Sequence, residues 1–273
     1  MLSYALSQPA REAEPALVPG SSAPAARPLT RQPVVQPAPD ELHKQAEHAQ
    51  RHNDLRYQGN LDDEKTGTGN IKWPDKRFYR GDIVAGFPYG KGHMLFPDGR
   101  RYSGDFYLGN MHGRGEIHWP DGSFYTGEFI NNVANGRGSY TAPSGDRYEG
   151  TFVDEKPHGY GSLTKRTGDL YVGEFRRGII EGQGTLTSSD GNVYDGEFRA
   201  GKPHGEGRRI WPDGRVYSGL WEGGVHHGAG IMTSANGDQV SGTFEQGRLH
   251  GVGSCVSKGV ETPCTFFKGE RLN

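Results

Sequence analysis

Large apolar side chains recur along this chain at a fixed interval, with polar residues between them. A tyrosine is followed two residues later by a glycine and four residues later by a large apolar residue, as in Tyr102, Gly104 and Phe106. A spacing of two places the three side chains on one face of a β-strand and does not fit a helical period. The pattern therefore predicts a β-strand wherever it occurs.

The strand pattern returns nine times, with a spacing of 22 residues once and 23 residues thereafter. The repeats start near residues 57, 79, 102, 125, 148, 171, 194, 217 and 240, and Val240 replaces the tyrosine of the ninth. A fixed period of this length is the signature of a repeat architecture, in which each unit buries its apolar face against its neighbours.

The second half of each repeat predicts a second strand and a turn. Most copies contain His-Gly-x-Gly, as at His112–Gly115, followed by alternating apolar residues such as Ile117. Asp-Gly or Asn-Gly pairs come next, as at Asp98-Gly99, and these pairs favour two-residue hairpin turns. We therefore expect an all-β fold, an elongated single-layer antiparallel sheet of about nine stacked hairpins over residues 56–273.

The N-terminal segment has a different composition. Residues 1–39 contain eight prolines and many alanines, a composition that predicts a disordered arm. Asp40 is placed to cap a helix, and the residues after it predict a short helix over about 41–53. The expected organisation is a disordered arm at 1–39, a capping or docking helix within 40–55 and the repeat sheet at 56–273.

Composition and charge narrow the class of protein. The chain has 44 glycines, only 32% hydrophobic residues and a net charge of -2. An ordinary globular core is therefore not expected, and there is no overall attraction to nucleic acid. No apolar run is long enough for a membrane span. The N-terminal residues do not read as a secretory signal, which predicts a cytoplasmic protein.

The two cysteines, Cys255 and Cys264, are too few for a disulfide framework, so we expect reduced thiols. If the last hairpin turns at Lys258-Gly259, the two residues lie diagonally across it, and a disulfide is then geometrically feasible.

The run from Tyr102 to Gly115, which reads Y-x-G-x-F-x-x-G-x-x-H-G-x-G, resembles the MORN repeat, and the resemblance covers about residues 57–269. It implies half-pipe or grooved sheets that act as scaffolds, dimerise and bind partner peptides or helices. It also implies a place in cilia, flagella, cytoskeletal collars or membrane junctions. Some members carry a fused catalytic domain, but the residues outside the repeats are too few here, so we expect no enzyme.

The aromatic rows are the candidate partner-binding groove. In one interpretation they only hold the hairpins together; in the other, part of their surface is exposed and binds a peptide or an amphipathic helix. The predicted groove residues are Tyr79, Tyr102, Tyr125, Tyr148, Tyr171, Tyr194, Tyr217, Phe106, Phe129, Phe152, Phe175, Phe198 and Trp221.

An open sheet also has two edges that invite pairing. The apolar C-terminal edge at Phe266 and Phe267 predicts a homodimer, and the helix over 41–53 is expected to cover the other edge.

No cofactor and no metal is expected. Histidines in successive repeats would lie two strands apart, about 9.6 Å, too far to share a zinc ion. His48 and His52, with His43 nearby, lack a convincing third ligand. The leading hypothesis is a scaffold or adaptor of a cytoskeletal, ciliary or flagellar assembly.

The alternative hypothesis is a membrane tether that binds phosphoinositides. It would use basic pairs such as Arg100-Arg101 and Arg208-Arg209, which acidic residues interrupt.

Overall fold

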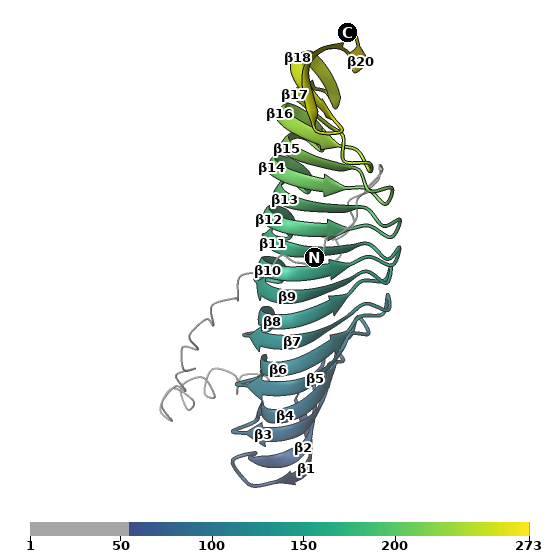
Figure 1. The fold of residues 1–273 in the computed structure, drawn as a ribbon. Helices are drawn as coiled ribbons and strands as arrows, with labels where there is room; N and C mark the ends of the chain where they lie inside the picture. The colour runs from purple at the N-terminus through teal and green to yellow at the C-terminus, as the bar shows by residue number, and fades with distance from the viewer. Residues whose placement is uncertain (1–54, 273) are drawn as a thin grey trace. The chain divides into compact units, whose positions relative to one another are not determined.

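The computed structural model describes residues 55–272, which contain no helix. Twenty strands form one antiparallel sheet, so the predicted all-β class is confirmed (Figure 1). The predicted arm at 1–39 and the predicted helix over 41–53 lie outside the described residues.

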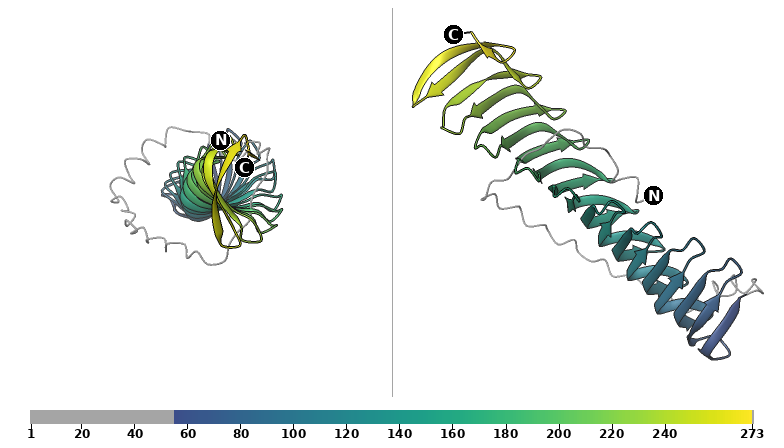
Figure 2. Two further views of the ribbon diagram at one scale, coloured as in Figure 1. Left: turned by 45° about the horizontal axis from the view of Figure 1, so that its top comes forward. Right: turned by 90° about the vertical axis from the view of Figure 1, so that its right-hand side faces the viewer.

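The described chain divides into two compact units. The N-terminal unit comprises residues 55–145 and 151–155, and the C-terminal unit comprises residues 146–150 and 156–272. Within each unit every strand pairs antiparallel with the next one along the chain. Figure 2 shows that the strands are curved rather than flat.

The strands of the N-terminal unit are β1 (Arg56–Leu61), β2 (Gly67–Lys72), β3 (Phe78–Val84), β4 (Phe87–Leu95), β5 (Arg101–Tyr107), β6 (Asn110–His118), β7 (Phe124–Ile130) and β8 (Val133–Thr141). Strand β9 (Arg147–Val153) contributes to both units. Those of the C-terminal unit are β10 (Lys156–Thr164), β11 (Leu170–Arg176), β12 (Ile179–Thr187), β13 (Val193–Arg199), β14 (Lys202–Ile210), β15 (Val216–Glu222), β16 (Val225–Thr233), β17 (Gln239–Glu245), β18 (Arg248–Ser257), β19 (Val260–Phe267) and β20 (Glu270–Arg271).

From β1 to β18, odd-numbered strands carry the tyrosine pattern, with Val240 in place of the tyrosine in β17, and even-numbered strands carry the Gly-x-Gly pattern. Strands β1 to β18 therefore make the nine predicted hairpins, and β19 with β20 adds a short tenth.

The tight turns lie at the opposite end of the hairpins from the one that the sequence predicted. The Asp-Gly pair at Asp98-Gly99 belongs to a five-residue connection, in which the Gly99 N–H donates to the Phe96 carbonyl. The two-residue turns instead join the tyrosine strand to the strand after it, as at Leu108-Gly109, where φ is 49° and 80°. The prediction was wrong because proline and an Asp98 side chain that binds the Arg100 N–H favour a longer connection.

Candidate interaction surfaces

One face of each unit, which we call the aromatic face, carries the tyrosine, the glycine and the large apolar residue of every repeat. The Tyr102 hydroxyl donates a hydrogen bond to the Asp105 carbonyl oxygen at 2.8 Å. The Tyr102 ring meets the rings of Phe106 and of Phe129, one repeat later, edge-on at 5.0 and 5.1 Å. Each tyrosine therefore joins two repeats, and such contacts add about 0.5–1.5 kcal/mol beyond burial.

Paired glycines make room for the tyrosine ring. Gly104 lies opposite Gly115 in the register of β5 and β6. A Cβ atom added to Gly115 would lie 2.3 Å from the Tyr102 hydroxyl oxygen, and one added to Gly104 would lie 2.4 Å from the Gly115 Cα atom. Both separations are shorter than any real contact between these atoms. The second glycine of Gly-x-Gly is therefore required by the tyrosine ring, and its partner Gly104 by the close approach of the two strands.

The aromatic face is closed to solvent, so the predicted partner groove is corrected. Tyr125 and Phe152 are both 0% exposed, and no ring of the predicted set exceeds 4%. The glycine pairs let each tyrosine lie flat on the backbone, and the edge-on phenylalanines fill the remaining space. The residues that form this core, rather than an accessible groove, are Tyr79, Tyr102, Tyr125, Tyr148, Tyr171, Tyr194, Tyr217, Phe106, Phe129, Phe152, Phe175, Phe198 and Trp221.

Burial also sets the charge state of the core. It raises the pKa of the Tyr102 and Tyr125 phenols well above the ordinary value and raises the pKa of Tyr217 to about 12. The hydroxyls therefore stay protonated well into the alkaline pH range, where they continue to donate hydrogen bonds to backbone carbonyls.

His226 is an unusual member of the aromatic face. It faces Trp221 at the position that Met111 occupies opposite Phe106. Its ring stacks on Tyr217 at 3.9 Å and meets Trp221 edge-on at 4.4 Å. Burial, followed by the charge of Arg209, lowers the pKa of His226 to about 4. Its Nε2 atom is buried and has no hydrogen-bond partner among the described residues.

The opposite face, which we call the polar face, carries a central row of side chains. The row consists of the residue three positions after each tyrosine and the residue between the two glycines of each Gly-x-Gly. In the N-terminal unit its charges alternate. The Lys91 ammonium lies 2.5 Å from the Asp105 carboxylate, which also accepts the Arg114 N–H at 2.9 Å. Arg114 faces Glu128 in turn.

In the C-terminal unit the central row loses this alternation. It begins with an exposed tyrosine, is then acidic or polar and becomes largely apolar, in the order Tyr160, Glu174, Gln183, Glu197, Glu206, Leu220, Ala229, Thr243, Val252 and Thr265. An open depression lies where the two parts meet. Its lining includes acidic residues, one basic residue and aliphatic residues, namely Asp195, Glu197, Glu206, Arg208, Leu220 and Ala229.

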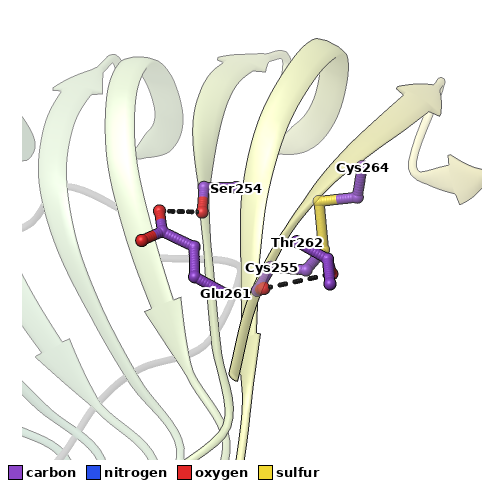
Figure 3. The surroundings of a disulfide bond; sticks show 5 residues. All are labelled: Ser254, Cys255, Glu261, Thr262 and Cys264. Carbon is purple, nitrogen blue, oxygen red and sulfur yellow. Dashed lines mark hydrogen bonds between the residues drawn. A yellow bond between two sulfur atoms is a disulfide. The ribbon is translucent and has the colours of Figure 1, made fainter. Parts of the chain in front are cut away.

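A disulfide joins Cys255 and Cys264 near the C-terminal end of the sheet (Figure 3). The disulfide corrects the prediction that both thiols are reduced. The predicted turn at Lys258-Gly259 is confirmed, because both residues have positive φ angles. The register aligns Cys264 with Gly253, in a position that a glycine, Gly242, holds one repeat earlier. No tyrosine ring lies above this position, so it accepts a side chain. The Cα atoms of Cys255 and Cys264 lie 5.9 Å apart, a separation that suits a disulfide.

The predicted dimer edge is only partly exposed. Phe266 is 8% exposed and packs with Cys255 and Cys264 in a small core, whereas Phe267 is 53% exposed. Strand β19 is also not the last strand, because β20 pairs with both phenylalanines. Alternation along the strand sends the two neighbouring rings to opposite faces, so Phe266 is not available to a partner.

Two basic residues from the pairs of the alternative hypothesis are engaged locally. The Arg100 guanidinium lies 2.7 Å from the Asp98 carboxylate and over the Phe96 ring. The Lys165 ammonium lies 2.9 Å from Asp146. Across residues 55–272 no three metal-binding side chains come together. In the same part of the chain no helix has the length and apolarity to cross a membrane.

A family model described as "MORN repeat" matches most of the described chain. The matched segments are residues 79–100, 102–124, 125–147, 148–170, 171–193, 194–214, 217–239 and 241–259. No curated protein matches the chain.

Solved structures give distant similarities. A mutant of the TCP10 domain of Danio rerio CPAP is 16% identical, with a TM-score of 0.33 over 70% of this chain and 90% of that one. The SAS-4 (dCPAP) TCP domain in complex with a proline-rich motif of Ana2 (dSTIL) of Drosophila melanogaster is 11% identical. Its TM-score is 0.30 over 81% of this chain and 99% of that one.

Proposed function

Because the chain belongs to the family of MORN-repeat proteins, we propose that it is a non-enzymatic protein-interaction scaffold or adaptor. The observation that carries the proposal is the difference between the two faces. The side chains of the aromatic face are buried against one another, whereas the polar face presents side chains to solvent on successive strands. A surface of repeated, outward-pointing side chains suits the capture of other proteins.

Because the aromatic rings are buried, a partner peptide or helix would bind to the polar face. Arg114 and Arg137 are exposed on the N-terminal unit, and Glu206 and Leu220 are exposed on the C-terminal unit. These side chains can change without disturbing the packing of the aromatic face, so sequence variation here would alter partner choice and leave the fold intact.

Affinity purification and proximity labelling with the full chain test the scaffold function. The expected result is a reproducible set of captured proteins, part of which is lost when Arg114→Glu and Arg137→Glu are combined. A matched control changes Lys72→Glu and Lys76→Glu, which are also exposed on the N-terminal unit but lie at the end of β2 and in the connection after it. A folded full chain that captures no protein above background would contradict the proposal.

A membrane tether is the second candidate function, and one cluster favours it. Arg176, Arg177, Arg199 and Lys202 are all exposed at the neighbouring hairpin ends of β11–β12 and β13–β14. Four basic side chains are the smallest number expected of an anionic lipid site. Flotation with phosphoinositide liposomes would show salt-sensitive binding that Arg176→Glu removes, whereas a scaffold without lipid affinity would stay unbound.

Homodimerisation and location complete the proposal. Phe267 is exposed beside the short strand β20, so the C-terminal edge is where a second copy would pair. Light scattering should then show a dimer that Phe267→Asp converts to a monomer; an unchanged mass would contradict it. The resemblance to family members supports a cytoplasmic, cytoskeleton-associated location, including a cilium or flagellum, which imaging of the tagged chain tests.

A further inference from the structure

The central row of the C-terminal unit contains carboxylates that lack the basic neighbours found in the N-terminal unit. The places of the N-terminal basic residues are taken by Gln183 and Glu206. Glu174 and Glu197 accept only backbone N–H groups, from Gln183 at 3.3 Å and from Glu206 at 3.4 Å. No ion pair within residues 55–272 involves Glu174, Glu197 or Glu206. Arg208 lies on the same face, where it faces Asp195 in the register of β13 and β14. Together with Asp195, the carboxylates of this part of the face still outnumber the basic side chains, so its charge is negative.

Beyond Glu206 the same face becomes apolar and stays exposed. Leu220 lies directly opposite Glu206 and is 40% exposed, Ile231 is 43% exposed and Val252 is 76% exposed. Exposed aliphatic side chains on neighbouring strands of one sheet face are typical of an interaction surface. They adjoin the carboxylates directly, so one ligand can contact both.

We propose that the polar face from β13 to β18 is a docking surface for an amphipathic helix of another protein. On the face of this helix that contacts the sheet, lysines or arginines in one half of its length contact the carboxylates. Leucines or isoleucines in the other half contact the aliphatic residues. The proposal rests on the scaffold function and specifies its surface and partner. The carboxylates favour the basic half of the helix by charge complementarity. The middle of the helix, where basic residues give way to aliphatic ones, lies over the depression between Glu197 and Leu220.

Strand spacing sets the size of the helix. From Glu197 on β13 to Val252 on β18 there are five strand steps, which span about 24 Å at about 4.8 Å each. A helix rises about 1.5 Å per residue, so about 16 residues cover this span. Its pitch of about 5.4 Å is close to the strand spacing, so each turn presents one side chain to one strand.

A labelled 16-residue amphipathic peptide tests the surface by fluorescence anisotropy on the full chain. The positions of its binding face carry lysines in the first half and leucines in the second half, and its opposite face is polar. A charge-reversed peptide, with glutamate for lysine, serves as the ligand control. We expect Glu206→Lys to weaken binding of the lysine peptide about tenfold and Leu220→Ser to weaken it several-fold. Raising the salt concentration should weaken binding to the wild-type chain as well.

Two matched variants control for general effects of charge and polarity. Glu245→Lys changes the same charge, and Ile179→Ser removes an aliphatic side chain that is 52% exposed. Both residues are exposed on the C-terminal unit but lie at hairpin ends, outside the central row. Each should change the affinity by less than about twofold, since long-range charge effects at physiological salt are screened. Unchanged circular dichroism confirms that every variant is folded.

Several results would overturn the proposal. Equal binding of the lysine and charge-reversed peptides would exclude charge recognition, and equal losses from the row variants and the controls would exclude this surface. A Leu220-dependent dimer in light scattering would assign the surface to a second copy of the chain. Binding that appears only after deletion of residues 1–54 would assign it to the chain's own N-terminal segment.

Failure here is distinguishable from failure of the scaffold function. If the full chain and its Glu206→Lys, Leu220→Ser double variant capture the same proteins equally, the scaffold function is supported but this surface is not the one that binds them. Capture of no proteins by either chain would contradict the scaffold function itself.

Discussion

The regular repeats and the last hairpins solve the same packing problem in different ways. In the repeat of Tyr217, a ring lies over the glycine pair Gly219 and Gly230. In the last hairpins Val240 replaces the tyrosine, and a disulfide between Cys255 and Cys264 fills part of the small core. The comparison teaches that the glycines of a pair beneath a tyrosine ring lie too close to the facing backbone and to the ring for a side chain, whereas Gly242, which has no ring above it, has more room.

The largest expected effect separates two glycines in neighbouring repeats. A Cβ atom at Gly219 would lie 2.5 Å from the Gly230 Cα atom, whereas one at Gly242 would approach nothing closer than the flexible Leu249 side chain at 3.3 Å. Gly219→Ala should therefore lower the free energy of unfolding by about 3 kcal/mol, and Gly242→Ala should change it by less than about 1 kcal/mol. Urea unfolding measures both. Equal losses would show that the close packing beneath the Tyr217 ring does not set the cost of a side chain at these positions.

Reduction of the disulfide should destabilise the C-terminal hairpins by about 2–3 kcal/mol. The bond closes a loop between residues nine positions apart, and chain entropy gains about this much when such a loop opens. Hydrogen exchange with and without a reducing agent measures the loss in β17 to β19. The paired variant Cys255→Ser, Cys264→Ser is the control, because its exchange should not respond to the reducing agent.

His226 should make the C-terminal unit sensitive to acid. Its pKa of about 4 in the folded chain lies below the value of 6.5 expected when unfolded, so the unfolded chain binds more protons between these pH values. Stability should be full above about pH 6.5 and fall by on the order of 2 kcal/mol as the pH approaches 4. Thermal unfolding against pH should show a flatter profile for His226→Leu. An identical profile would mean that His226 is solvated.

The smallest expected effect concerns a tight turn of the regular repeats. Asp154 and Glu155 both adopt positive φ, 49° and 63°, where the equivalent turn Leu108-Gly109 has a glycine second. Glu155→Gly should stabilise the chain by about 0.5–1 kcal/mol, because glycine adopts this conformation without strain. The reverse change, Gly109→Glu, should cost a similar amount. Thermal unfolding of both variants tests the pair, and shifts of the same sign would contradict the explanation.

Much of the fold was predictable because the repeat reports strand geometry directly. The alternation of Tyr102, Gly104 and Phe106 requires a strand, and nine copies in phase require neighbouring hairpins. The position of the tight turns was not predictable in the same way. Asp-Gly pairs suit both two-residue and longer connections, and the proline before Asp98 decides between them only in its three-dimensional context.

The candidate sites were harder to predict. Periodicity places Tyr125 and Phe129 on one face but does not reveal whether that face is open, and ring packing against paired glycines closes it. Phe266 and Phe267 read as one apolar edge, yet strand alternation buries the first and exposes the second. The change in the central row was visible as residues in the sequence, but only strand register aligns Glu206 with Leu220.

By itself, the sequence determined the strands of the regular repeats and the family, because these properties depend on local spacing that repeats along the chain. The tertiary structure alone decided which face is accessible, whether the two cysteines meet and where the charges on the polar face are unbalanced. These properties depend on contacts between residues that are distant in the chain, and such contacts exist only once the register between strands is set.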